Sequence, residues 1–125
     1  MDSTILKQLI LRYMEGWITG NREQILSTLD PACLVIECYG PTYRGKAMVG
    51  RWIDSWFAPG NRVNRWEVTS FYTADEACFF EWLFACTYEG SQSSFEGASL
   101  ARVRQGKILF LREYAMTAPR YDWEG

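Results

Sequence analysis

Residues 77–116, ACFFEWLFACTYEGSQSSFEGASLARVRQGKILFLREYAM, have the clearest secondary-structure pattern of the chain. Apolar side chains recur in it at every second position, and short polar turns containing glycine interrupt it. This alternation is typical of half-buried strands joined by hairpins. The residues just before it follow the same pattern, so we expect four consecutive antiparallel strands. The predicted strands are 62–73, 77–89, 94–104 and 107–116.

The first half of the chain has helical periodicity instead. Apolar residues recur every three or four positions over residues 4–19 and again over residues 46–57. Asn21 is placed to cap a short second helix, which we expect Asp30-Pro31 to end. One β-rich run, Cys33–Tyr39, lies between the second and third helices.

Helices that come first and strands that come last favour an α+β fold over alternating α/β units. We expect one curved antiparallel sheet with the three helices on its concave face. A bent sheet closed by helices leaves a cone-shaped interior, and such interiors often hold a pocket. The expected domain is residues 1–118, followed by a short tail over residues 119–125.

Composition removes several classes of function. The chain of 125 residues carries a formal charge of −2 and no histidine. A slightly negative chain lacks the excess of basic residues that binding to nucleic acid or an anionic membrane requires. The absence of histidine excludes Ser-His-Asp catalysis and His-ligated metals. The four cysteines form no C-x-x-C pair, so we expect reduced core thiols, no metal and no cofactor. Without a signal peptide or a membrane span, we expect a cytoplasmic protein.

The order of elements and several local motifs resemble the nuclear transport factor 2-like superfamily, and within it the SnoaL-like and ketosteroid-isomerase-like branch. The likeness covers roughly residues 4–117. The matching motifs are Arg12-Tyr13, Gly20-Asn21, Leu34-Val35-Ile36-Glu37, Tyr43-Arg44-Gly45-Lys46-Ala47, Thr87-Tyr88-Glu89-Gly90 and Arg102-Val103-Arg104-Gln105-Gly106-Lys107-Ile108.

This resemblance implies a catalytic site. The helix-one tyrosine that donates a hydrogen bond to a developing oxyanion falls on Tyr13, and the carboxylate base after the first strand falls on Glu37. The second oxyanion donor falls on Ser99, where the isomerase family has an aspartic acid. The resemblance also implies that the Glu113 side chain points into the interior of the cone.

Two carboxylates in one apolar cavity would raise each other's pKa. One could then be protonated near neutral pH while the other is a base, as general acid–base catalysis requires. We therefore predict Glu37 as the base, Glu113 as an acid or orienting group, and Tyr13 as a donor to substrate oxygen. The alternative is that each glutamate pairs with an arginine or reaches solvent at the mouth of the cone.

Aromatic side chains are numerous enough to line a pocket. Those predicted to contact a flat apolar ligand, beside Tyr13, are Trp17, Trp52, Trp56, Trp82 and Phe84. The alternative is that they are ordinary core residues. Trp66 and Trp123 have no firm placement from the sequence.

Three functions remain open: a cofactor-independent isomerase or cyclase acting on a small hydrophobic substrate, a non-catalytic small-molecule-binding protein, or a dimeric interaction module with a filled interior. The outer sheet face is expected to be apolar with charged edges, which is typical of a homodimer interface. Its apolar residues are Leu83, Ala85, Ala98, Leu100, Phe110, Tyr114 and Met116.

Overall fold

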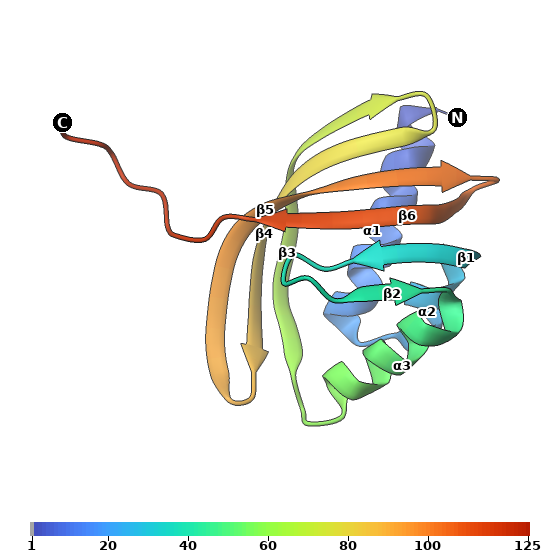
Figure 1. Cartoon of the computed structure of the whole chain (residues 1–125), viewed down its shortest axis with the longest axis horizontal. Helices are drawn as coiled ribbons and strands as arrows, with labels where there is room; N and C mark the ends of the chain where they lie inside the picture. The colour runs from blue at the N-terminus through green and yellow to red at the C-terminus, as the bar shows by residue number, and fades with distance from the viewer. Residues whose placement is uncertain (1) are drawn as a thin grey trace.

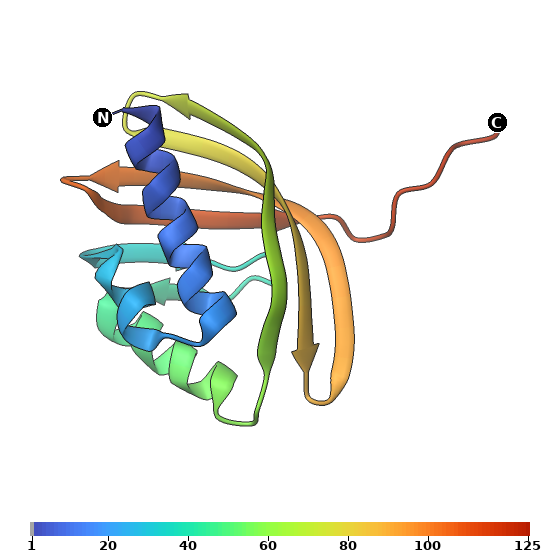
Figure 2. The same ribbon diagram turned by 180° about the vertical axis from the view of Figure 1, so that it is seen from behind.

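The computed structural model describes residues 2–125, and within them a bent sheet wraps around three helices (Figures 1 and 2). The elements are α1 (Ser3–Thr19), α2 (Arg22–Ser27), β1 (Leu29–Ile36), β2 (Thr42–Arg44), α3 (Lys46–Phe57), β3 (Arg62–Ala74), β4 (Ala77–Tyr88), β5 (Ser91–Arg104) and β6 (Lys107–Ala115). The α+β class and the predicted helix and strand order are confirmed, and β2 is an additional strand that the sequence did not predict.

The sheet has the strand order β2-β1-β6-β5-β4-β3. Its strands pair antiparallel except for β1 and β6, which pair in parallel. The expectation of a wholly antiparallel sheet was therefore wrong at this one junction. β1 and β6 are distant in the sequence and are not joined by a hairpin, so nothing in the local sequence forces them to run antiparallel.

Two-residue hairpins join the last four strands. Asp75, Glu89 and Gln105 each adopt a positive φ, near 50°, at the first turn position. Such turns match the right-handed twist of the flanking strands, and the glycines that follow two of them favour the same geometry. Local turn chemistry therefore sets the register of β3 to β6.

Side chains cap the starts of the first two helices, and the predicted cap Asn21 is confirmed. The Asp2 side chain accepts a hydrogen bond from the Thr4 backbone N–H, and Asn21 accepts one from Gln24. Gly20 ends α1 in the left-handed conformation, with a φ of 68°. The predicted stop at Asp30-Pro31 was wrong, because α2 ends at Ser27 and those two residues already belong to β1.

A glycine in β5 makes room for a tryptophan of the neighbouring strand. Gly97 lies opposite Trp82, and a Cβ at Gly97 would come within 2.4 Å of both the Trp82 ring and the Tyr114 carbonyl oxygen. Only a residue without a side chain leaves space for the indole at this close approach. In β6, Ile108 and Leu111 are both buried although they are three residues apart. A register shift beside Leu109 reverses the alternation, so both side chains point to the inner face of the sheet.

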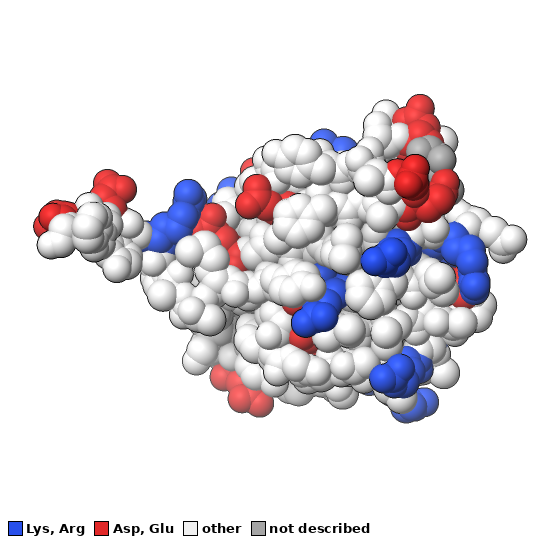
Figure 3. All heavy atoms as spheres, turned by 45° about the horizontal axis from the view of Figure 1, so that its top comes forward, with Lys and Arg blue, Asp and Glu red and all other residues white. Residues whose placement is uncertain are grey.

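On the outer face of the sheet the pairing register brings the expected apolar residues together, and Figure 3 shows a mostly uncharged surface with lysine, arginine and acidic groups scattered across it. Arg102 and Arg112 lie over the rings of Phe110 and Tyr114 there. The tail projects from the body in Figures 1 and 2, with Trp123 81% exposed. None of the helices in the described residues combines the length and apolar character needed to cross a bilayer.

Candidate functional site

A cavity of about 610 Å³ lies between the inner face of β3–β5, the helices α1 and α3, and the loop after β1. Its volume is in the range of sites that hold small organic ligands. The lining residues are Tyr13, Trp17, Glu37, Cys38, Tyr39, Pro41, Tyr43, Trp52, Ser55, Trp56, Val63, Trp66, Trp82, Phe84, Cys86, Tyr88, Ser93, Phe95 and Glu113. The interior is therefore hollow, unlike that of the filled interaction module considered above.

All predicted site residues line this cavity except Ser99. Ser99 is 1% exposed on β5, where its hydroxyl oxygen accepts a 2.9 Å hydrogen bond from the Trp82 indole N–H. It holds the ring that forms part of the wall, but it does not itself reach the cavity. The resemblance assigned Ser99 to the site, but in the structure its hydroxyl is engaged with Trp82 and Ser99 is not among the lining residues.

The parallel pairing of β1 and β6 brings the two glutamates together. Val35 pairs with Leu111 and Ile36 with Arg112, so the next residues in register are Glu37 and Glu113. Val35 and Leu111 are both buried, and side chains two positions further along point to the same face of a sheet. Both carboxylates consequently enter the cavity from adjacent positions.

Glu37 is held by a tyrosine from the neighbouring hairpin strand. The Tyr43 hydroxyl donates a 2.5 Å hydrogen bond to Glu37 Oε1. The Tyr43 ring stacks on Trp52 of α3, with centroids 4.2 Å apart and planes inclined by 9°. Burial raises the pKa of Glu37, and the hydrogen bond from Tyr43 opposes that rise because it favours the carboxylate.

Glu113 is in a less favourable environment for charge. Burial, reinforced by the negative charge of Glu37, raises the pKa of Glu113 to about 8, although a hydrogen bond from the Cys38 backbone N–H favours ionisation. No salt bridge to either glutamate exists among residues 2–125. Glu113 is therefore mainly protonated at neutral pH.

Tyr13 closes the inner end of the cavity. Burial raises the pKa of Tyr13 well above its usual value, and the nearby charge of Glu113 adds to the effect. Its hydroxyl, like the indole N–H groups of Trp17 and Trp66, is enclosed and has no hydrogen-bond partner. These are the unsatisfied buried side-chain atoms of the described part of the chain, and all three residues line the cavity.

Two sets of aromatic rings form the walls. On the helical side, Trp17 contacts Trp52 and Trp56 with ring centroids 4.7 and 5.7 Å apart. On the sheet side, Phe84 contacts Trp66 and Phe95 at 5.6 and 5.3 Å. A flat ligand between these walls would contact rings on both sides.

The sequence did not predict several lining residues, of which Tyr43 contacts Glu37 directly. Tyr39, 72% exposed, and Tyr88, 46% exposed, mark the mouth of the cavity. The alternation of β4 does predict that Tyr88 shares a face with Trp82. Nothing comparable predicts Tyr43, whose position depends on the short strand β2. No group of three possible metal ligands is present in the described residues.

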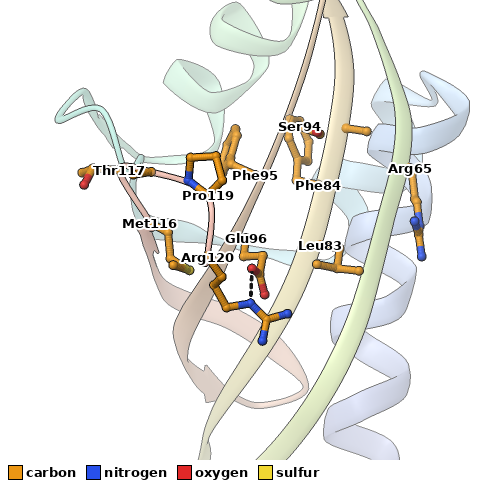
Figure 4. A pocket seen from close by; sticks show the side chains of 12 residues that line it. Arg65, Leu83, Phe84, Ser94, Phe95, Glu96, Met116, Thr117, Pro119 and Arg120 are labelled. Carbon is orange, nitrogen blue, oxygen red and sulfur yellow. Dashed lines mark hydrogen bonds and ion pairs between the residues drawn. The ribbon is translucent and has the colours of Figure 1, made fainter. Parts of the chain in front are cut away.

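A second hollow lies on the other side of the sheet, beside the start of the tail (Figure 4). There Arg120 donates a 2.7 Å hydrogen bond to Glu96. This hollow contains a paired carboxylate and exposed residues of the tail, so its chemistry is that of a surface salt bridge. The inner cavity is the better candidate because its carboxylates have no cationic partner.

A comparison with protein families shows which family this chain belongs to. The SnoaL-like domain family matches residues 10–110. The chain belongs to the SnoaL-like domain family. No curated protein sequence matches it.

Solved structures share the SnoaL-like fold at low sequence identity. An LEH-like epoxide hydrolase from M. tuberculosis has a TM-score of 0.81 and 12% identity, covering 91% of this chain and 84% of that chain. A protein with a ketosteroid isomerase-like fold from Catenulispora acidiphila, in complex with trimethylamine, has a TM-score of 0.76 and 17% identity, covering 85% and 83%. A protein of unknown function with a cystatin-like fold from Methylobium petroleophilum has a TM-score of 0.74 and 16% identity, covering 98% and 82%.

Proposed function

We propose that the protein is a cofactor-independent enzyme of the isomerase or cyclase type, which moves a proton on a small hydrophobic carbonyl compound. The observation that carries the proposal is the pair of adjacent carboxylates, Glu37 and Glu113, in one aromatic cavity without a cationic partner. Acid–base catalysis needs one group that accepts a proton and another that donates one.

The environments of the two glutamates favour different protonation states. Tyr43 donates to Glu37 and favours its charged form, so Glu37 is the candidate base. Glu113, whose pKa is raised to about 8, is the candidate acid. Pairs of titratable groups whose surroundings separate their pKa values are typical of acid–base sites. A carbonyl oxygen near Glu113 would accept its proton while Glu37 removes one from the adjacent carbon.

Membership of the SnoaL-like family agrees with a small-molecule ligand in the cone. The neighbour in complex with trimethylamine shows that a protein of this fold binds a small organic molecule.

A non-catalytic binding protein is the second candidate, and one observation favours it. The Tyr13 hydroxyl is enclosed, and Ser99 is separated from the cavity by Trp82. Neither donor of the expected oxyanion pair therefore reaches a ligand in this conformation. Binding in the aromatic cavity would need neither of them.

Deuterium exchange separates the two candidates. 2-Tetralone is a flat ketone with acidic C–H groups, and proton NMR in D₂O follows their replacement by deuterium. We expect the protein to accelerate this exchange and Glu37→Gln to abolish the acceleration. Glu15→Gln, at an exposed position on α1, is the matched control and should retain it.

Tryptophan fluorescence measures binding of the same ketone independently of exchange. If the ketone binds but exchanges no faster than in buffer, the catalytic proposal is wrong and the binding function remains. If exchange is accelerated equally by Glu37→Gln, Glu37 is not the base.

A further inference from the structure

We propose that this cavity also binds a small organic ammonium ion, whose cationic group lies beside Glu37 and Glu113 and against the surrounding aromatic rings. The inference rests on the proposed function only in placing a small molecule in the cavity. The ammonium ion is a second class of ligand, distinct from the neutral carbonyl substrate, and it would ionise Glu113 instead of using it as an acid.

The charged side chains of the cavity wall are all acidic. Nineteen residues line the cavity, and they include two glutamates but no lysine or arginine. The whole chain has 13 lysines and arginines, and the salt bridges of the described residues all lie elsewhere. A partly buried carboxylate without a cationic partner is costly, and a cation that enters the cavity removes that cost.

The aromatic lining favours the same class of ligand. Eleven of the nineteen lining residues are tryptophan, tyrosine or phenylalanine. The negative face of an aromatic ring attracts a cation, most strongly for tryptophan, and aromatic cages are a common way to bind organic ammonium groups. Trp52 is central here, because its ring contacts both Trp17 and Tyr43, and Tyr43 in turn holds Glu37.

Proton release gives a second, independent readout. A bound cation favours the charged form of Glu113, which is mainly protonated at neutral pH in the free protein. The other titratable groups near Glu113 are Glu37, Tyr13, Cys38, Tyr39 and Tyr43. Burial raises the pKa of the three tyrosines and of Cys38 further above neutral, so these groups keep their protons. Glu113 is thus the main source of a proton released on binding.

The test compares choline with 3,3-dimethylbutan-1-ol, which has the same shape and no charge. Isothermal titration calorimetry at neutral pH, in two buffers of different protonation enthalpy, gives both the affinity and the number of protons released. We expect choline to bind about ten-fold or more tightly than the alcohol. We also expect proton release with choline and none with the alcohol.

Variants of the two glutamates test which carboxylate contributes to choline affinity and which one releases the proton. Glu37→Gln should weaken choline and leave the alcohol unchanged, whereas Glu113→Gln should abolish proton release. Glu15→Gln is the control and should change neither. Far-ultraviolet circular dichroism checks that each variant is folded.

Each alternative result is decisive. Equal affinity for choline and the alcohol, or no binding of choline, overturns the ammonium proposal and leaves the exchange of 2-tetralone to be judged separately. A preference for choline that survives both glutamate substitutions also overturns it. If choline binds as expected but 2-tetralone exchange is not accelerated, the ammonium site stands and the enzymatic function fails.

Discussion

Replacing Glu113 with glutamine should make the protein more stable, and increasingly so as the pH rises. Burial and the charge of Glu37 raise the pKa of Glu113 from 4.5 to about 8. Between those two pH values the folded protein holds a proton that the unfolded chain has lost, so the folding stability falls as pH increases. Glutamine has nearly the same shape, still accepts a hydrogen bond from the Cys38 N–H, and does not titrate.

The size of the effect follows from the shift. Each unit of pKa difference corresponds to about 1.4 kcal/mol. The advantage of Glu113→Gln should therefore be small near pH 4, grow by up to roughly 1.4 kcal/mol per pH unit, and level off above about pH 8. The full range is a few kcal/mol, a large share of the roughly 5–15 kcal/mol by which domains of this kind are stable.

Urea unfolding followed by tryptophan fluorescence measures this directly, at a series of pH values between about 4 and 9. The matched control is Glu15→Gln, whose stability should follow that of the wild type throughout. Parallel curves for Glu113→Gln and the wild type would show that the pKa of Glu113 is not raised in the folded protein. A loss of stability in Glu113→Gln at low pH would also contradict the prediction, because the protonated glutamate and glutamine are nearly equivalent there.

Three further substitutions have defined outcomes. Tyr43→Phe removes the hydrogen bond to Glu37 and should raise the pKa of that carboxyl, as carbon-13 NMR of labelled glutamate would show; a lower pKa would contradict the assignment. Ser99→Ala leaves the Trp82 indole N–H without an acceptor and should cost about 1–3 kcal/mol in urea unfolding; an unchanged stability would contradict the role of this hydrogen bond. We also propose that the outer sheet face forms a homodimer, so sedimentation should find a dimer for the wild type and a monomer for Leu100→Glu. A monomeric wild type at micromolar concentration would contradict that proposal.

Local signals in the sequence predict most of the individual elements. The third helix has its predicted bounds, because its apolar stripe is uninterrupted and a proline and glycine follow it. The second helix starts after its predicted cap, Asn21, and the last four strands lie close to their predicted ranges. Each of these features depends on residues that are neighbours in the sequence.

Long-range pairing is what the sequence does not predict. The short strand β2 has only three residues, Thr42–Arg44, too few to produce a recognisable alternation. It nevertheless places Tyr43 beside Glu37, and the parallel contact of β1 with β6 places Glu37 beside Glu113. The resemblance indicated which glutamate to consider first, but the partners of that glutamate depend on strands far apart in the chain.

Folding alone does not account for Glu113. A neutral residue of similar size would avoid burying a carboxyl beside a second one, and the pKa of about 8 measures how unfavourable its ionisation is. Burial of Ile108 and Leu111 on the same strand shows that β6 makes its apolar contacts without Glu113. A residue that reduces stability while lining a cavity is expected where function requires its chemistry. Glu113→Gln should therefore gain stability at alkaline pH and also lose proton release on choline binding. A variant that gained stability but still released protons would show that the unfavourable burial of Glu113 is unrelated to ligand binding.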